Sequence, residues 1–420
     1  MERAANRIVK TYVTLTLLST FASSFIWGIN TLFLLDAGLT ITEAFTANAF
    51  FTAGQVIFEI PTGIVADTRG RRMSFLLGTA TLFATTIAYL WLWQIKGPFW
   101  AWAIVSALLG LGFTFFSGAT EAWLVDGLKA AGYHKDLDSI FAKGAIATGI
   151  AMLTGTVAGG LIAQYMNLGV PYVMRIVALG ATFVIAALMM HDEGFTPKKK
   201  TSLFREARDV AAESMEFGLR NAPIRWMMFS AFFNWGVAIF AFYAMQPYLL
   251  ELYGSSDSYA VAGISAAIVA GAQIVGGLLV PYANRLFTKR TSLLLAGAAV
   301  STVALFLIAV AGNFWIVLIL LSVWSIVFAA TGPIRQSYVN GIVPSEQRAT
   351  VLSADNMFAS AGGVVSQPAL GKVAEVWGYP ASYLGSAIFQ AFALPFLILA
   401  RRENAKSDPI DVEVASPRPS

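Results

Sequence analysis

Four of the charged residues that lie inside or at the ends of long apolar runs could do chemistry, because a charge is costly there. They are Asp36, Glu59, Glu121 and Arg335. An unpaired charge away from water costs several kcal/mol, so a carboxylate there gains from taking up a proton or from pairing with an arginine. These residues are our candidates for a gate or for proton coupling.

An internal repeat relates two of them. The stretch GATEAWLVDG at 118–127 resembles GPIRQSYVNG at 332–341, which gives Glu121 and Arg335 equivalent positions in two halves of the chain. We expect them to form and break a salt bridge as a central cavity changes its open side. The alternative is that both side chains reach the membrane surface from nearby helix ends.

The other two acids have weaker assignments. Glu59, in FEIPTG, is a candidate buried carboxylate. Asp36, at the end of an apolar run, either binds protons or cations or is an ordinary interfacial residue, and Arg175 is its expected partner.

The elements that position these residues follow from composition. The chain has 420 residues, of which 57% are hydrophobic and 12% charged, which is typical of a membrane protein. A spanning helix needs about 20 apolar residues, and we identify twelve such runs in two sets of six. The predicted spans are 12–35, 43–66, 74–94, 99–125, 142–164 and 171–190, then 224–249, 259–283, 291–311, 314–338, 350–371 and 381–400.

Most of the 28 Lys and Arg residues fall between these runs on the side that holds both termini. The positive-inside rule therefore places both termini in the cytoplasm of a plasma membrane, the inner membrane in a bacterium. We predict an all-α fold of two six-helix bundles related by a pseudo-two-fold axis along the membrane normal. The predicted domains are 1–190 and 223–402 for the bundles, 191–222 for a cytoplasmic linker and 403–420 for a disordered tail. The linker contains either an amphipathic helix on the membrane surface or a simple solvated helix.

Several function classes are disfavoured. The basic residues are spread over one membrane face, so the net charge of +4 needs no nucleic-acid partner. We expect no metal site, because the chain has no cysteine and its two histidines lack a second ligand. A phosphate-binding loop for ATP is missing, so we expect no cofactor and no catalytic residue.

With this organisation in place, GIVADTRGRR at 63–72 resembles the signature loop between helices two and three of the major facilitator superfamily. Gly63, Asp67, Gly70, Arg71 and Arg72 match, whereas Thr68 replaces the usual basic residue. Gly63 permits close approach of a neighbouring helix, and Gly70 permits a tight turn. The resemblance implies that Asp67 meets the start of helix eleven. It also implies that Arg71 pairs with Asp126, so that the cluster latches the two halves in one conformation.

A second resemblance concerns the direction of transport. GTVAGG at 155–160 is similar to the glycine motif of antiporters of this superfamily, through Gly155, Gly159 and Gly160, with Thr156 where a proline is usual. The alternative is ordinary helix packing.

The same resemblance implies that helices one, four, seven and ten line the cavity. The candidate substrate residues on them are Trp27, Asn30, Phe115, Asn234, Trp235, Tyr243 and Gln246.

Together these features predict a monomeric secondary transporter that works by alternating access and exports lipophilic organic compounds in exchange for protons. Lipid and a small-molecule substrate are its expected partners. The alternatives are a proton symporter or uniporter that imports a small organic solute and, in another class, a membrane-embedded enzyme acting on lipid.

Overall fold

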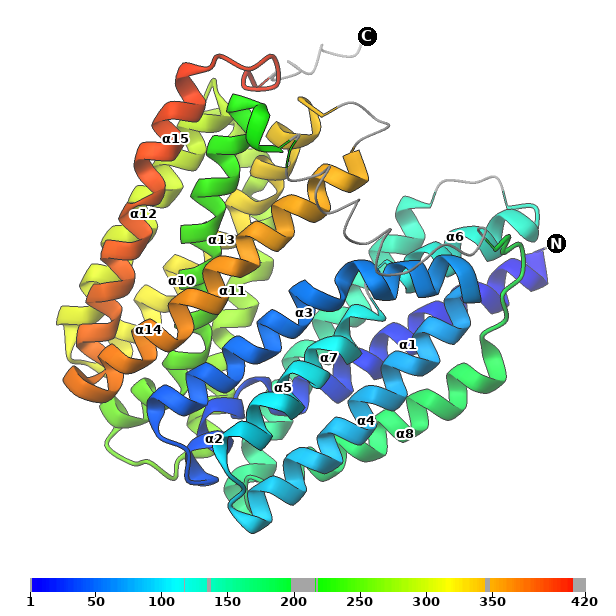
Figure 1. Ribbon diagram of the computed structural model, residues 1–420, viewed down its shortest axis with the longest axis horizontal. Helices are drawn as coiled ribbons and strands as arrows, with labels where there is room; N and C mark the ends of the chain where they lie inside the picture. The colour runs from blue at the N-terminus through cyan, green and yellow to red at the C-terminus, as the bar shows by residue number, and fades with distance from the viewer. Residues whose placement is uncertain are drawn as a thin grey trace, which may run out of the picture. The chain divides into compact units, whose positions relative to one another are not determined.

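The computed structural model describes residues 2–116, 118–133, 137–197, 216, 218–343 and 348–410, and this part of the chain is almost entirely helical (Figure 1). The helices are α1 (Glu2–Trp27), α2 (Asn30–Asp36), α3 (Ile41–Arg69), α4 (Arg71–Ile95), α5 (Phe99–Thr114), α6 (Ala119–Ala130), α7 (Asp138–Tyr165), α8 (Val170–Met189), α10 (Ala222–Tyr253), α11 (Tyr259–Leu286), α12 (Arg290–Ala311), α13 (Phe314–Asn340), α14 (Arg348–Ala391) and α15 (Ala393–Arg402). The predicted linker helix lies largely outside the described residues.

Within the described ranges, ten helices are long and apolar enough to cross a membrane, and the bent pair α1 and α2 makes an eleventh span. The stretch Val351–Arg402 has 52 residues. Its chain turns at Gly378, where φ is 83°. Since a span needs only about 20 residues, this stretch contains two spans and the total reaches twelve. The predicted fold class, an all-α membrane protein of two helical bundles, is thus confirmed.

Two predicted spans are broken rather than straight. The run at 12–35 bends by 48° between α1 and α2. The run at 99–125 divides into α5 and α6, where Gly118 takes a left-handed φ of 64°. Glycine has no Cβ to clash in this conformation, so it lets a helix stop and restart within a span.

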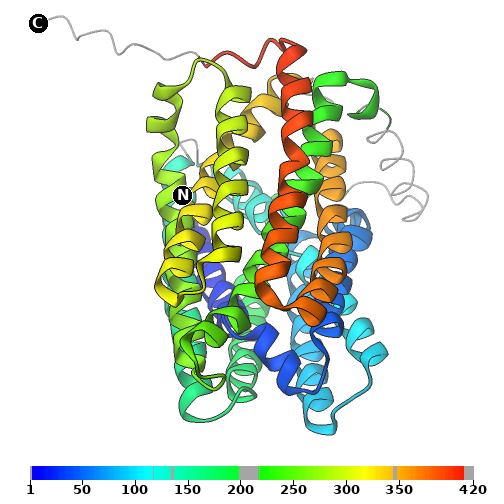
Figure 2. The same cartoon turned by 90° about the vertical axis from the view of Figure 1, so that its left-hand side faces the viewer.

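The helices group into two compact units. Unit 1 contains 1–208, 242–268 and 367–375, and unit 2 contains 209–241, 269–366 and 376–420. In unit 1, α3, α5, α4 and α8 follow one another side by side (Figure 1), and α1 packs on α7 and α8. In unit 2, α12 packs on α13 and on α15 (Figure 2).

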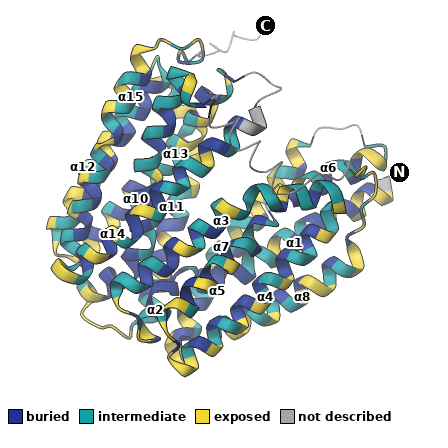
Figure 3. Cartoon of the chain, viewed as in Figure 1, coloured by how far each residue is buried: buried dark blue, intermediate teal, exposed yellow. Residues whose placement is uncertain are grey.

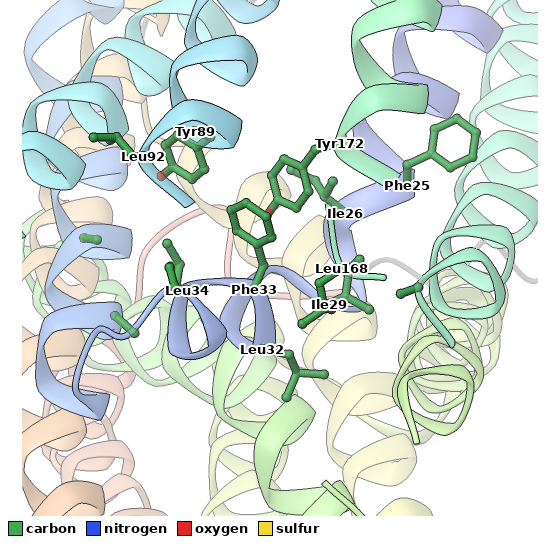
Figure 4. Close-up of a cluster of buried hydrophobic side chains, with 14 of the residues drawn as sticks. Phe25, Ile26, Ile29, Leu32, Phe33, Leu34, Tyr89, Leu92, Leu168 and Tyr172 are labelled. Atoms are coloured by element: carbon green, nitrogen blue, oxygen red, sulfur yellow. The ribbon is translucent and has the colours of Figure 1, made fainter. Parts of the chain in front are cut away.

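Aromatic rings fill the core of unit 1 (Figure 4). Phe33 of α2 stacks on Tyr172 of α8 with ring centroids 3.9 Å apart. Tyr89 of α4 lies beside both rings, and its hydroxyl is 2.6 Å from that of Ser106. The short helix α2 is therefore fixed by stacking, which its seven residues could not achieve by helix propensity alone.

Exposed side chains alternate with buried ones along single helices such as α4, α8 and α12 (Figure 3). Many of the exposed side chains are large and apolar, for example Trp91, Val177 and Phe306. In water such a surface would aggregate, whereas in a bilayer it faces lipid.

Each unit caps one of its helices in the same way. Asp192, just beyond α8, accepts a hydrogen bond of 2.8 Å from the backbone nitrogen of Arg72, the second residue of α4. Asp408, beyond α15, accepts one of 2.8 Å from the nitrogen of Thr291, the second residue of α12. A carboxylate at a helix N-terminus satisfies free N–H groups and the helix dipole.

The second cap corrects an expectation about the C-terminus. Residues 403–410 belong to the predicted disordered tail, yet Asp408 is buried. The backbone nitrogen of Ile410 also donates a hydrogen bond of 3.0 Å to the carbonyl of Thr288. The side chain of Asp408 also accepts from the Thr291 hydroxyl at 2.9 Å. The segment is ordered because its polar groups complete the start of α12.

We expect Asp192→Ala and Asp408→Ala each to lower the free energy of unfolding by about 1–2 kcal/mol, the usual cost of losing an N-cap. Thermal unfolding of the purified protein in detergent measures this. Glu193→Ala is the matched control, because Glu193 is exposed beside Asp192. Equal unfolding midpoints for control and cap variants would contradict the assignment.

Candidate functional site

A cavity of about 450 Å³ lies inside unit 2, between α10, α12, α13, α14 and α15. One wall is aromatic. The ring of Phe328 stacks on Trp324 with centroids 5.8 Å apart and lies 5.4 Å from the ring of Trp235. Such faces bind flat apolar groups of a ligand.

The rest of the described lining combines neutral polar side chains with small or aliphatic residues, and Arg335 is its one charged member. Asn234 and Gln390 are joined, the amide nitrogen of Gln390 donating to the side-chain oxygen of Asn234. Asn234 itself donates to the carbonyl of Ser230 at 3.0 Å. Ser301, Thr331, Asn356 and Ser360 complete this part of the lining. The cavity therefore offers both hydrogen-bonding groups and aromatic faces.

One ion pair adjoins this cavity. Arg335 of α13 lines the cavity and makes a two-point contact with Asp355 of α14, with N to O distances of 2.7 and 2.5 Å. The side chains of Arg335 and Asp355 are 23% and 3% exposed. A third bond, of 3.3 Å, from Arg335 to the carbonyl of Met227 fixes the guanidinium. A pair this buried is stable only while both partners keep their charge.

Arg335 thus has a partner within its own unit other than the predicted Glu121, and the pairing with Glu121 stays a prediction. Glu121 is exposed in the first turn of α6, whereas Arg335 is neutralised within its own unit by Asp355. Sequence reasoning missed Asp355, although it is the one charged residue in the predicted span 350–371. That signal could have identified it.

The predicted latch residues lie around the junction of α3 and α4. Gly70 separates the helices with a φ of 105°, which only glycine adopts easily. Arg71 pairs with Asp67 at 2.7 Å, one turn earlier, and not with Asp126, which is half-buried on α6. The i,i+4 spacing makes Asp67 the nearer carboxylate. Arg72 donates 2.8 Å to the carbonyl of Ala187.

Within unit 1 no described atom lies within 4 Å of the position that a Cβ would take on Gly63, so the close helix contact expected there is not seen. Of the two remaining candidate acids, Glu59 is less buried than predicted. Glu59 is half-buried on α3. Asp36 is exposed and accepts 2.6 Å from the indole nitrogen of Trp93, and it does not pair with Arg175.

The glycines of the antiporter-like stretch make close helix contacts. A Cβ on Gly159 would lie 1.9 Å from the carbonyl oxygen of Phe25, so α7 packs directly on the backbone of α1. A Cβ on Gly155 would meet Ser24 at 2.6 Å, and one on Gly160 would lie 2.7 Å from the Cα of Gly263 on α11. Small residues are what allow such approach.

The predicted substrate residues separate into three groups. Asn234 and Trp235 line the 450 Å³ cavity. Trp27, Asn30 and Tyr243 line a smaller cavity inside unit 1. Phe115 and Gln246 line neither of the two.

Gln246 has a structural contact instead, at the break between α1 and α2. Its side-chain oxygen accepts a hydrogen bond of 2.9 Å from the backbone nitrogen of Thr31. Its side-chain nitrogen donates one of 2.8 Å to the backbone carbonyl of Trp27. Both backbone groups lie at the interruption in the helix, so the side chain replaces the missing helical bonds.

Among the described residues, no three His, Asp or Glu side chains are grouped as a metal site would require. Two helical bundles of membrane-spanning length, with a ligand-sized cavity inside one of them, are features that a membrane transport protein requires.

Comparison with known proteins identifies the family. The model of the Major Facilitator Superfamily matches residues 12–367 and 258–419, and the chain belongs to this superfamily. No curated protein sequence matches the chain.

Similar folds occur among solved structures. The nucleoside transporter NupG has a TM-score of 0.75 at 14% identity, covering 93% of this chain and 99% of its own. A peptide transporter POT has a TM-score of 0.74 at 12% identity, covering 94% of each chain. A D-xylose-proton symporter has a TM-score of 0.67 at 14% identity, covering 94% of this chain and 97% of its own. At these identities the likeness concerns the fold alone.

We expect Asp355→Asn or Arg335→Gln alone to lower the free energy of unfolding by about 3–5 kcal/mol, because each leaves one buried partner without its counter-charge. The double variant should be less destabilised than the sum of the two. A double-mutant cycle on thermal or chemical unfolding in detergent measures the coupling. Additive effects would contradict the pairing.

Proposed function

We propose that the protein is a proton-coupled exporter of lipophilic organic compounds, a drug/proton antiporter that works by alternating access as a monomer. The observation that supports this best is the unit 2 cavity, which is lined by an aromatic wall and by Arg335, whose partner in a buried ion pair is Asp355. The membrane is the plasma membrane, with both termini on the cytoplasmic side.

Cavity size and lining suggest the substrate class. A volume of about 450 Å³ falls within the range of roughly 300–1,000 Å³ found for small-molecule sites. Trp324 and Phe328 favour a flat aromatic portion of the substrate, and Asn356 and Ser301 favour a hydrogen-bonding portion. We therefore infer an aromatic compound with a few polar groups, lipophilic enough to enter from the bilayer.

The ion pair supplies a plausible coupling step. A proton that binds Asp355 removes the counter-charge of Arg335, which must then turn to substrate, to water or to the Met227 carbonyl. Protonation of Asp355 and the contacts of Arg335 are therefore linked, so a proton and a substrate that reach this pair affect each other's binding. Moving one charge down about 100 mV releases roughly 2.3 kcal/mol, enough to drive such an exchange. Glu121, Glu59 and Asp36 remain secondary candidates for proton uptake.

The junction of α3 and α4 is the proposed conformational latch, with Gly63, Asp67, Gly70, Arg71 and Arg72 as its residues. The Asp67 to Arg71 pair is only partly buried, so it can open at low cost. Asp126 remains a candidate partner for Arg71 in another state of the cycle.

A second candidate function is proton-coupled import of a small polar solute. The neutral polar lining favours it, as does the fold shared with a D-xylose-proton symporter and with a peptide transporter. The two candidates differ in the direction in which a proton gradient drives the substrate.

Transport by purified protein in liposomes, driven by a pH jump and tested against a panel of organic compounds, separates them. An exporter accumulates substrate in the compartment from which protons leave, and a symporter accumulates it where protons arrive. Transport that ignores the gradient would contradict both forms of proton coupling.

We expect Trp324→Ala to weaken apparent affinity for aromatic substrates about tenfold or more, because one lost ring contact is worth about 0.5–1.5 kcal/mol beyond its buried area. Trp315→Ala is the matched control, since Trp315 is on the same helix but 66% exposed. Equal losses in both variants would indicate that the aromatic wall does not contact substrate.

A further inference from the structure

Unit 1 contains a buried arginine for which the described residues provide no carboxylate. Arg175 of α8 is 1% exposed. Its Nε donates 3.1 Å to the hydroxyl of Thr86, and its guanidinium lies 5.9 Å from the ring centre of Phe113. Its Nη2 is buried without a hydrogen-bond acceptor. Arginine stays protonated in proteins, so the charge cannot be avoided by losing a proton.

A second donor without a partner lies close by. The hydroxyl of Tyr172 donates a hydrogen bond of 3.1 Å to the side-chain oxygen of Asn30. The side-chain nitrogen of Asn30 donates one of 3.0 Å to the side-chain oxygen of Asn48. This series of hydrogen bonds ends at the side-chain nitrogen of Asn48, which is buried and has no acceptor among the described residues. Every oxygen along the series is occupied, so its free end is a donor.

Both donors line one small cavity of about 40 Å³. Its other walls are mostly apolar or aromatic and include Ile26, Phe51 and Leu109. By the same measure one water molecule needs about 10–15 Å³, so the cavity admits a group of a few heavy atoms and no drug-sized molecule. A positive charge and an amide donor that share an otherwise apolar pocket favour a negatively charged acceptor.

We propose that this cavity binds a small monovalent anion, held by the guanidinium of Arg175 and the side-chain amide of Asn48. The anion is either a halide ion or a carboxylate of only a few heavy atoms such as formate, since both offer a single charge and compact acceptors. The site is lined by residues other than those of the unit 2 cavity and does not depend on the proposed direction of transport.

The test measures the thermal unfolding midpoint of the full-length protein in detergent, in sodium chloride, bromide, formate or gluconate at constant ionic strength. Gluconate is too large for the cavity. We expect a saturable rise of the midpoint, on the order of 2 °C or more, with the small anions over gluconate. A rise with halides identifies a free inorganic ion, and a rise with formate alone identifies a carboxylate group.

Two variants make the test specific. Arg175→Gln removes the charge, so the midpoint should no longer depend on the anion. Asn48→Asp adds a carboxylate inside the cavity, so its midpoint in gluconate should approach that of the unaltered protein in chloride. Lys129→Gln removes an equal but exposed charge on α6 and should keep the full anion dependence.

The proposal is overturned if chloride and formate give the midpoint found in gluconate, which would mean that water suffices in the cavity. It is also overturned if the anion effect persists unchanged in Asn48→Asp. Since the measurement requires no transport, its failure is distinguishable from a failure of the proposed antiport.

Discussion

A polar group inside a bilayer has no water to bond with, so it must find its partner within the protein. The break between α1 and α2 illustrates this constraint. The chain turns by 48° there, and Gln246 supplies both the acceptor and the donor that the interrupted helix lacks. A side chain far away in sequence thus makes a bend possible that the local sequence could not support alone.

The same constraint gives buried charges their functional value. Arg335 and Asp355 neutralise each other beside a cavity large enough for an organic molecule. Because either partner alone would be costly, a proton on Asp355 would change what Arg335 must contact, and this is the basis of the proposed link between protonation and substrate binding. Arg175 meets the constraint differently, with hydroxyl, aromatic and amide neighbours in place of a carboxylate. One unit thus contains a neutral pair, and the other contains a cation that suits an anion.

The two units also repeat structural solutions that the sequence shows only faintly. Asp192 and Asp408 cap the starts of α4 and α12 through the second residue of each helix. Gly159 brings α7 onto the carbonyl of Phe25, and Gly362 brings α14 onto the carbonyl of Phe232, with an added Cβ only 1.9 and 1.8 Å away. Caps and close backbone contacts depend on one small or acidic residue each, so they persist while the surrounding residues change.

The sequence by itself determined the all-α membrane fold, because about 20 apolar residues in a row have few alternatives to a spanning helix. It also predicted the turn at Gly70, and it singled out Asn234 and Trp235, which line the unit 2 cavity. It could not determine the partner of Arg335, since a repeat relates positions in two halves but does not show which neighbouring helix turns a carboxylate toward them. Only the tertiary structure decided that Asp355 neutralises Arg335, that Gln246 closes a helix break and that Arg175 meets no carboxylate among the described residues. The physical reason is that hydropathy fixes where a helix crosses the membrane, whereas its rotation and neighbours, which choose the partners of polar groups, are set by packing.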